Sequence, residues 1–414
     1  MLKALTLERY RCFVAPARLE LRPLTLLFGR NSVGKSALLR ALPLVAASCG
    51  EPAPNRTGPL ALEHPSAMGA RYADVRTHLV AKNELGITLS WGGVAGLEDV
   101  AIGLRDMTDM GPTRQVVSRW SARTTAGEEL RAELDPETQK LLIDGDASKV
   151  LELSGLTPKL APTMRSYEQG ALAACSAVVH NLSLLVDWLG PFREPPPRSR
   201  VARVENARLG PLGQGLTEVL ADPGATDRFA RVRTWVKSIF GAELEIAEES
   251  GEVSLAIRVG ANRTHILDVG GGVAHVLPVL VRLADVALDR ARARILAIEQ
   301  PEVHLHPEAE VALANVIVDA IAAVREHPQR PSVVLETHSE NLLLSLQLAI
   351  LEKRLAADDV LLLWFDRFDD GSVVPQTIRI TESGRPEPPL PPGVFAEDLE
   401  IARKILRARS KRHA

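Results

Sequence analysis

The chain has 414 residues, which is long enough for one large or two ordinary domains with a substantial core. Its formal net charge of −3 excludes a basic field over the whole surface, so any contact with DNA would need a local patch. The apolar and charged fractions, 46% and 24%, are ordinary for a globular protein.

The cysteines and the apolar segments indicate a cytoplasmic protein. Cys12, Cys49 and Cys175 are far apart, form no metal-type pair and fit a reducing compartment. The amino-terminus alternates between apolar and other residues and carries charges, unlike a signal peptide. The most apolar helical stretch, 171–190, contains polar side chains such as His180, so we expect a buried or partner-facing helix and no membrane span.

The amino-terminal half contains predicted strands, a glycine-rich turn and two helices. Alternating apolar residues predict strands within 3–10 and 17–28, and a helix is expected directly after the turn. The stretch 50–66 is rich in proline and glycine and is predicted to be a loop. Weakly patterned strands follow from about 70 to 165, and a helix is predicted at 166–190.

The carboxy-terminal half alternates between strands and helices. Helices are predicted at 227–241, 273–290, 307–325 and 339–355, and strands at 243–249, 253–260, 294–299, 332–337 and 359–366. This alternation near both ends, with a long irregular middle, predicts an α/β fold: a mixed sheet with flanking helices that carries a large α+β insertion. We expect a core formed by 1–80 and 260–380, an inserted subdomain at 80–260 and an extension at 381–414.

A phosphate-binding loop is the clearest motif. In LTLLFGRNSVGKSALLRAL, four residues separate Gly29 from Gly34, and the motif lies between an apolar strand and a helix. The N–H groups of such a turn point inward, and the following helix directs its positive end at phosphate. Lys35 would reach the β- and γ-phosphates, and the Ser36 hydroxyl would bind magnesium. The expected ATP-binding residues are Gly29, Arg30, Asn31, Ser32, Val33, Gly34, Lys35, Ser36 and Ala37.

A second candidate element is the apolar strand in RILAIEQPEVHLHP, residues 294–307. Glu299 ends this strand at the position where P-loop ATPases place the acid that holds magnesium. In such an ATPase the next residue usually activates the attacking water. Here the next residue is Gln300, which cannot accept a proton.

Four segments in this order, FGRNSVGKS, DVGGGVAHVLPVL, LAIEQPEVHLHPEAE and LETHSENLLLSLQ, resemble a prokaryotic family of stand-alone AAA-type ATPases. That family belongs to the ABC-like branch related to SMC, RecF and OLD proteins. Ser32, together with WLGPFREPPPR and LPPGVFAEDLE, resembles the subgroup with a C-terminal domain of unknown function. The resemblance implies an ABC-like P-loop ATPase core that uses ATP and Mg²⁺.

The resemblance also implies roles for single residues. Glu299 would bind Mg²⁺ together with Ser36, and His338 would be the switch histidine that hydrogen-bonds the γ-phosphate. The loop 304–307 would cross to a partner subunit, so we do not expect its histidines to bind zinc. ATP would be held between two protomers and act as a dimerising ligand. A degenerate signature motif would bind the γ-phosphate of the partner's ATP through the backbone amides of Asp268, Gly270, Gly271 and Gly272.

The sequence departs from the pattern of the wider branch in three respects. Asp268 and Val269 stand where ABC transporters and SMC proteins have a serine before the glycines. No clear counterpart of the glutamine loop is present, although 69–78 lies where one is expected. The sequence contains no long heptad repeat, so the coiled coil of an SMC protein is not predicted.

Three alternatives for hydrolysis stay open. Gln300 would orient the attacking water through its amide, as in small GTPases that hydrolyse slowly unless assisted. Alternatively Glu302 would move in as the base, with Pro301 fixing the turn. In the third alternative the site binds ATP without cleaving it. We expect slow hydrolysis to which Gln300 or Glu302 contributes, with His338 as the third candidate catalytic residue.

The expected function is an ATP-driven switch, a homodimer that closes on ATP and controls a separate effector protein in a prokaryotic defence system. The family resemblance implies this context. The alternative is a DNA-repair or DNA-structure clamp of the RecF or SMC type, with Arg198, Arg200 and Arg203 or the C-terminal arginines as candidate DNA contacts. A transporter subunit is disfavoured by the poor signature and the missing glutamine loop.

Overall fold

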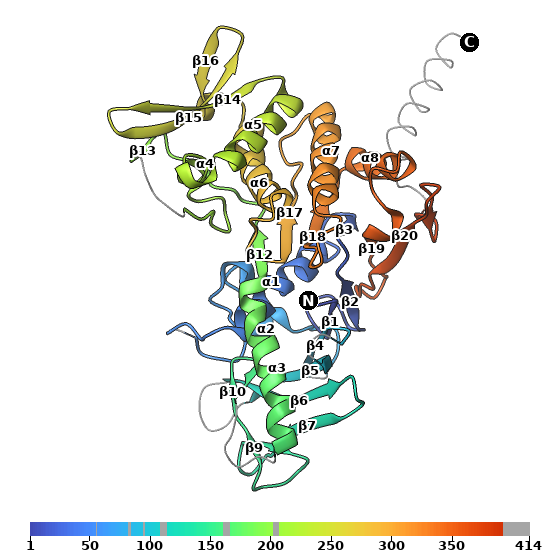
Figure 1. Cartoon of the computed structure of the whole chain (residues 1–414). Coiled ribbons are helices and arrows are strands. Elements are labelled where there is room, and N and C mark those ends of the chain that lie inside the picture. Colours follow the sequence, from blue (N-terminus) through green and yellow to red (C-terminus); the bar gives the residue numbers. More distant parts are fainter. Residues whose placement is uncertain are drawn as a thin grey trace, which may run out of the picture.

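The structure, a computed structural model, describes residues 1–54, 56–81, 84–93, 96–107, 114–159, 166–201 and 207–391. Its centre is a seven-stranded sheet in the order β12-β17-β18-β3-β19-β20-β21 (Figure 1). The first five of these strands run parallel to one another. β20 pairs antiparallel with β19, and β21 pairs antiparallel with β20. The strands are β3 (Leu24–Gly29), β12 (Val186–Leu189), β17 (Ile295–Glu299), β18 (Ser332–Thr337), β19 (Val360–Phe365), β20 (Gln376–Ile380) and β21 (Pro386–Glu387).

Alternate residues of the central strands face two separate hydrophobic cores. In β18, Val333 and Leu335 belong to one core and Val334 belongs to the other. Burial on both faces explains why these strands are nearly continuous apolar runs. Helices of the first core are α5 (Thr226–Phe240), α6 (Gly271–Ala287), α7 (Pro307–Ala323) and α8 (Glu340–Leu351), and helices of the second are α1 (Lys35–Cys49) and α3 (Ser166–Leu185).

An eight-stranded antiparallel sheet completes the second core. Its order is β2-β1-β4-β5-β6-β7-β8-β9, so β1 pairs directly with β4, which lies beyond residue 80, and β2 forms the edge next to β1. Its strands are β1 (Ala4–Glu8), β2 (Ala17–Glu20), β4 (Glu84–Ser90), β5 (Leu97–Met107), β6 (Arg114–Thr124), β7 (Glu129–Leu134), β8 (Leu141–Ile143) and β9 (Val150–Leu151).

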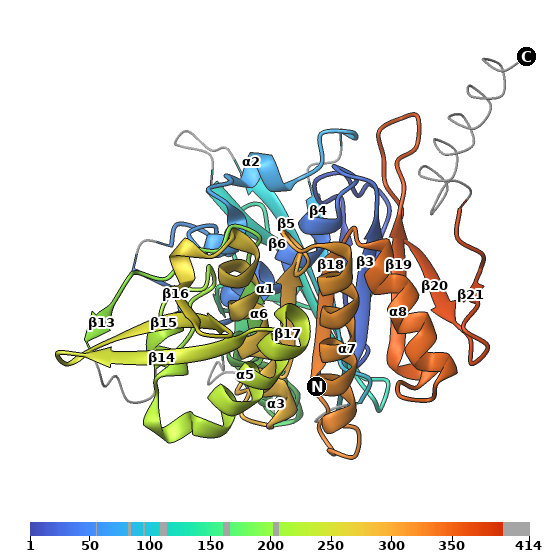
Figure 2. The same cartoon turned by 90° about the horizontal axis from the view of Figure 1, so that it is seen from above.

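A further small sheet projects from the end of the molecule opposite to β5–β9 (Figure 1). Figure 2 shows it on the other side of the β17–β18–β3 centre from β20 and β21. It consists of β13 (Arg200–Val201), β14 (Glu243–Glu249), β15 (Glu252–Val259) and β16 (Asn262–His265). The remaining elements are α2 (Tyr72–Val75), α4 (Leu216–Leu220), β10 (Leu153–Ser154) and β11 (Thr157–Pro158).

The predicted α/β class, with a mixed sheet and flanking helices, is confirmed. The range 80–260 contributes strands to the eight-stranded sheet, β12 to the central sheet, and β13–β15 to the projecting sheet. The strand pairing of the central sheet continues past 380 to β21. The division into core, insertion and extension stays a prediction, and residues 392–414 of the extension lie outside the described residues.

The helix predicted at 166–190 is wrong in its last residues. The helix ends at Leu185, and Val186–Leu189 form β12, which pairs in parallel with β17. Residues 182–189, which span the end of the helix and the strand, are mostly apolar and contain no glycine or proline. Their pattern therefore does not distinguish a helix from a buried strand. Pairing with β17, and burial of Trp188 and Leu189, decide in favour of the strand.

Gly29 ends β3 where the neighbouring strand leaves no room for a side chain. Its φ is 143°, and a Cβ atom there would overlap the carbonyl oxygen of Phe365, its register partner in β19. The phosphate loop therefore leaves the sheet at a position that only glycine occupies without strain.

We expect Gly29→Ala to destabilise the protein by about 1–3 kcal/mol, because the new methyl group would strain the backbone contact with β19. Gly170→Ala is the matched control, since Gly170 is helical and a Cβ atom there meets nothing within 4 Å. The control should unfold at the same temperature as the wild type or slightly higher. Thermal unfolding without nucleotide measures both, and an unchanged midpoint for Gly29→Ala would contradict the close contact.

Candidate nucleotide-binding site

The phosphate loop joins β3 to α1 through left-handed backbone conformations. Ser32 has φ 60° and Gly34, which precedes the first helical residue, has φ 96°. A Cβ atom on Gly34 would lie 2.5 Å from the Sγ atom of Cys12, so glycine is needed there for packing as well. The first turn of α1 contains no acidic residue, so no side chain of the turn itself competes with an anion for the amides at this helix end.

One cavity of about 610 Å³ collects six of the nine predicted ATP-binding residues together with Gln300 and His338, and this volume lies in the range of small-molecule sites. It combines the phosphate loop with the residues that follow β17 and end β18. The parallel register brings the ends of β3, β17 and β18 to one edge of the sheet. The lining residues are Arg11, Cys12, Asn31, Ser32, Gly34, Lys35, Ser36, Ala37, Gln300, Glu336 and His338.

Lys35 is folded back onto its own loop. Its Nζ atom donates hydrogen bonds to the carbonyl oxygens of Gly29 at 2.9 Å and Arg30 at 2.5 Å. Burial lowers the pKa of Lys35, and the nearby carboxylates of Glu336 and Glu302 oppose this shift. The ammonium group therefore lies inside the loop, where a phosphate would replace the two carbonyl groups as its partner.

Ser36 contacts a carboxylate that the sequence interpretation missed. Its Oγ atom donates a 2.6 Å hydrogen bond to Oε1 of Glu336 in β18, while Oε2 of Glu336 is buried without a hydrogen-bond partner. Burial and the charge of Glu299 raise the pKa of Glu336. The available signal was an acid within an otherwise apolar strand, two residues before the predicted switch histidine.

Glu299, the predicted magnesium ligand, ends β17 and is 1% exposed. Arg40 binds it in a bidentate manner, with Nε 2.8 Å from Oε1 and Nη2 2.6 Å from Oε2. Trp188 donates a further hydrogen bond of 2.9 Å to Oε1, and Arg193 donates one to the backbone carbonyl of Glu299. Glu299 does not line the cavity that contains Ser36.

One face of α1 explains how the two acids are separated. Ser36 and Arg40 are four residues apart and so project from the same side of the helix. Ser36 contacts Glu336 of β18, and Arg40 contacts Glu299 of the neighbouring β17. Glu299 and Glu336 lie directly opposite each other in the register of β17 and β18. Each acid is therefore contacted by a different side chain on the same face of α1.

The three predicted catalytic residues lie around the loop after β17. Gln300 has φ 44° and lines the cavity, and its backbone N–H donates to the carbonyl of Glu336 at 2.8 Å. Glu302 is buried, and its Oε1 atom accepts a 2.8 Å hydrogen bond from the backbone N–H of His338. Burial raises the pKa of Glu302. Gln300 and His338 therefore line the cavity, whereas Glu302 contacts the backbone of His338, just after β18.

The predicted signature residues lie outside this cavity. Gly270 and Gly271 are exposed at the start of α6, and Asp268 forms an ion pair with Arg198. A Cβ atom on Gly272 would lie 2.6 Å from the carbonyl oxygen of His304. The glycine-rich helix start thus packs against the loop that follows β17.

The histidines of that loop make different contacts. His304 has φ 66° and its ring lies 4.7 Å from that of His275, measured between centroids. His306 precedes the first residue of α7. Within the described ranges, no three His, Cys, Asp or Glu side chains are arranged to hold a metal ion alone. A nucleotide-bound Mg²⁺ needs only one or two protein ligands, because phosphates and water supply the others.

We expect His338 to titrate near pH 4, because burial and the charge of Lys35 lower its pKa to about 4. In the unfolded chain the same ring would have a pKa of about 6.5. As the pH falls from about 6.5 to about 4, the unfolded chain therefore gains a proton before the folded chain does, and the free energy of unfolding decreases. NMR titration of the His338 ring, assigned by comparison with His338→Gln, measures the pKa. A value at or above 6.5 would contradict a half-buried histidine that is neutral beside Lys35.

Comparison with known proteins agrees with this geometry. Residues 198–345 match the family model described as "AAA domain, putative AbiEii toxin, Type IV TA system". No curated protein matches the sequence. No described helix combines the length and apolar character needed to cross a membrane.

Three solved SMC head structures are similar to the chain, each with low identity. An SMC head bound to the C-winged helix domain of ScpA is 11% identical with a TM-score of 0.48, and covers 92% of this chain and 98% of its own. The SMC head domain from Thermotoga maritima is 10% identical with a TM-score of 0.42, covering 91% and 98%. A head domain with an extended coiled coil, bound to the C-terminal domain of ScpA from Pyrococcus furiosus, is 11% identical with a TM-score of 0.46, covering 99% of both chains.

The matched segment begins after the phosphate loop and includes β17 and β18, the two strands that complete the cavity. The chain is thus similar to an AAA domain over residues 198–345, and the arrangement of β3, β17 and β18 around the phosphate loop fits a P-loop nucleotide-binding site.

Proposed function

We propose that the chain binds ATP with Mg²⁺ in the cavity at the end of β3, β17 and β18, and hydrolyses it slowly. The observation that carries this proposal is the convergence of Lys35, Ser36, Gln300, Glu336 and His338 on one cavity from three separate segments. Lys35 would leave its loop carbonyls for the phosphates, to which the start of α1 also directs its amides.

A magnesium site at this position fits the side chains present. The Ser36 hydroxyl and one of two neighbouring carboxylates, Glu299 or Glu336, would hold the ion, and the orphaned Oε2 atom of Glu336 is a suitable ligand. Mg²⁺ would stabilise the charge that develops on the phosphates during hydrolysis. These residues would hold the ion, and through it the phosphates, whether or not cleavage is fast.

Slow hydrolysis follows from the residues near the attacking water. Gln300 lines the cavity but can only orient water through its amide. Glu302 can accept a proton, but in this structure it binds the backbone of His338. It would therefore need either to move or to act by positioning His338, and both possibilities are consistent with a low rate.

We also propose that ATP joins two copies of the chain. The glycine-rich start of α6 is exposed, has no side-chain cap and lies outside the phosphate cavity of its own chain. Such a helix start attracts an anion. In a pair of chains, Gly270 and Gly271 of one would face the γ-phosphate held by the other, so that bound ATP stabilises the dimer.

The dimer would act as a switch for a separate effector protein. The matched family is described as a putative toxin of a type IV toxin–antitoxin system, which supports a role in prokaryotic conflict or defence. A toxin or nuclease is the kind of effector that such a switch would control.

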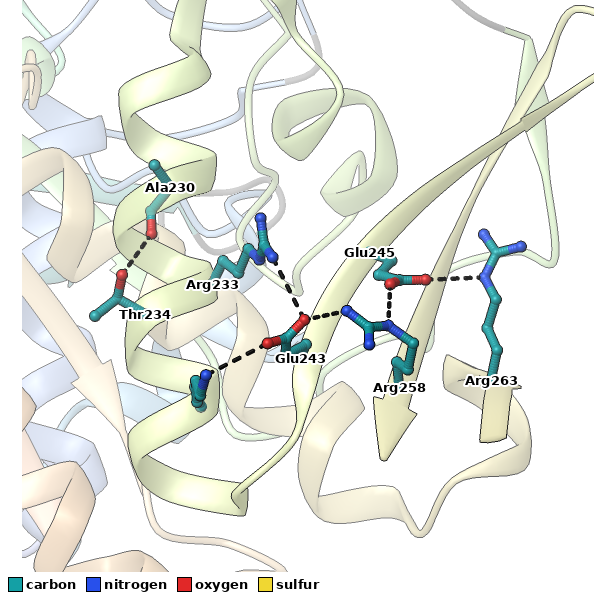
Figure 3. Close-up of polar contacts among 8 residues, drawn as sticks. Ala230, Arg233, Thr234, Glu243, Glu245, Arg258 and Arg263 are labelled. Carbon is teal, nitrogen blue, oxygen red and sulfur yellow. Dashed lines mark hydrogen bonds and ion pairs between the residues drawn. The ribbon is translucent and has the colours of Figure 1, made fainter. Parts of the chain in front are cut away.

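The alternative, a DNA clamp, receives little support from the described arginines. Arg198 is paired with Asp268, and Arg200 is paired with Glu218, while Arg203 lies outside the described residues. Arginines of the projecting sheet are also neutralised, because Arg258 and Arg263 point toward Glu243 and Glu245 (Figure 3). Paired arginines release few counterions on DNA, so a strong salt-dependent affinity is not expected.

We expect a non-hydrolysable ATP analogue with Mg²⁺ to convert the protein from a monomer to a dimer, measured by light scattering after gel filtration. Lys35→Ala should remain a monomer because it no longer holds the phosphates. Gly270→Glu should also remain a monomer while it still binds the analogue, because its carboxylate would repel the partner's γ-phosphate.

Gly270 suits this test because a Cβ atom there meets nothing within 4 Å and its backbone is not left-handed, so the variant should fold. A wild-type protein that binds the analogue and stays monomeric would contradict the ATP-held dimer. A wild type that does not bind the analogue would contradict nucleotide binding itself.

We expect Gln300→Glu to raise the rate of ATP hydrolysis, since a base positioned at the water contributes on the order of 10²-fold or more. Glu302→Gln should lower the rate if Glu302 serves as the base or positions His338. Steady-state phosphate release measures both. If neither variant changes the rate, both assignments are wrong.

A further inference from the structure

We infer that Glu336 of β18, and not Glu299 of β17, is the carboxylate that holds Mg²⁺ beside Ser36. This inference rests on the proposed binding of ATP in the same cavity. The sequence predicts that the carboxylate ligand of Mg²⁺ lies at the end of β17, whereas this inference places it on the neighbouring strand, β18.

The hydroxyl of Ser36 gives the first reason. Its proton is donated to Oε1 of Glu336 at 2.6 Å. A hydroxyl that donates its proton keeps its lone pairs for another partner. The hydrogen bond to Glu336 therefore fixes the orientation in which Ser36 offers those lone pairs to a cation, and it brings a carboxylate next to the same position.

The second reason is the unused oxygen of Glu336. Oε2 is buried and has no hydrogen-bond partner, although Glu336 lines the cavity. A buried carboxylate oxygen without a partner is costly, and binding of a cation would remove that cost. An oxygen ligand is also what Mg²⁺ prefers.

Glu299, in contrast, has no oxygen left for a metal ion. Its Oε1 atom accepts from Arg40 and Trp188, and its Oε2 atom accepts from Arg40. The guanidinium group neutralises the carboxylate in a bidentate pair, the strongest form of such a contact. Coordination of Mg²⁺ by Glu299 would break this buried pair and leave Arg40 without its partner.

Charge balance in the cavity supports the same assignment. The charges of Lys35 and Arg40 both act on Glu336, and Lys35 is expected to shift toward the phosphates while Arg40 stays paired with Glu299. That movement would remove positive charge from the surroundings of Glu336. A divalent cation bound between Glu336 and the phosphates would restore the balance, whereas the balance at Glu299 would not change.

The test compares Glu336→Gln with Glu299→Gln in the full chain. A fluorescent ATP analogue is titrated first without Mg²⁺ and then at increasing Mg²⁺, and thermal unfolding is recorded without nucleotide. We expect Glu336→Gln to bind the analogue without Mg²⁺ as well as the wild type does. For the increase in affinity that Mg²⁺ produces, the variant should need a Mg²⁺ concentration at least about ten-fold higher. Glu336→Asp, which keeps the charge, should recover part of this gain.

For Glu299→Gln we expect a lower unfolding temperature and an unchanged Mg²⁺ requirement, because Arg40 loses its buried partner but the metal keeps its ligand. If that variant does not fold, the double variant Arg40→Gln with Glu299→Gln removes both charges and should show the same Mg²⁺ requirement as the wild type.

The outcomes separate this inference from the proposed function. A larger Mg²⁺ requirement in Glu299→Gln or in the double variant, with none in Glu336→Gln, would overturn the assignment to Glu336. An equal Mg²⁺ requirement in all the variants would overturn it too. A wild-type protein that binds no analogue at any Mg²⁺ concentration would instead overturn the proposed nucleotide site.

Discussion

Two carboxylates, Glu299 and Glu336, are buried side by side at the ends of neighbouring parallel strands, and the organisation of the site follows from how their charges are compensated. Burial and the neighbouring charge of Glu299 both raise the pKa of Glu336. Arg40 forms a bidentate pair with Glu299, while the carboxylate of Glu336 accepts a hydrogen bond from the Ser36 hydroxyl and has the charges of Lys35 and Arg40 nearby. One acid is thus fixed in the structure and the other is available to a ligand.

The fold makes this distribution possible. A parallel sheet covered on both faces directs its loops to one edge, where the phosphate loop and the segments after β17 and β18 meet. Helix α1 starts at the same edge and presents Ser36 and Arg40 on one face, each toward a different acid. The helix that carries the phosphate loop therefore also sets which carboxylate remains free. The start of α6, exposed and glycine-rich, gives the molecule a second anion-attracting position that its own cavity does not use.

The sequence predicts the features that depend on local pattern. β18 has the predicted bounds, and the α/β class, the phosphate loop and the strand ending at Glu299 are read from apolar runs and glycine spacing. The partners of Glu299 are not accessible in this way, because Arg40 and Trp188 are 259 and 111 residues away in the chain. The sequence predicts helix at β12 because only pairing with β17 distinguishes this strand from the helix before it. The sequence pattern does not single out Glu336, because it lies inside its strand next to the last residue, where a side chain is normally assigned to the core.

The most direct measurement is a crystal structure with Mn²⁺ and a non-hydrolysable ATP analogue, with the metal located by its anomalous scattering. Mn²⁺ prefers the same oxygen ligands as Mg²⁺ and can be identified by this signal. The account predicts a metal peak between the β- and γ-phosphates, Ser36 and the carboxylate of Glu336, with the pair between Arg40 and Glu299 intact. A metal peak at Glu299 with Arg40 displaced, or a nucleotide bound away from the phosphate loop, would contradict it.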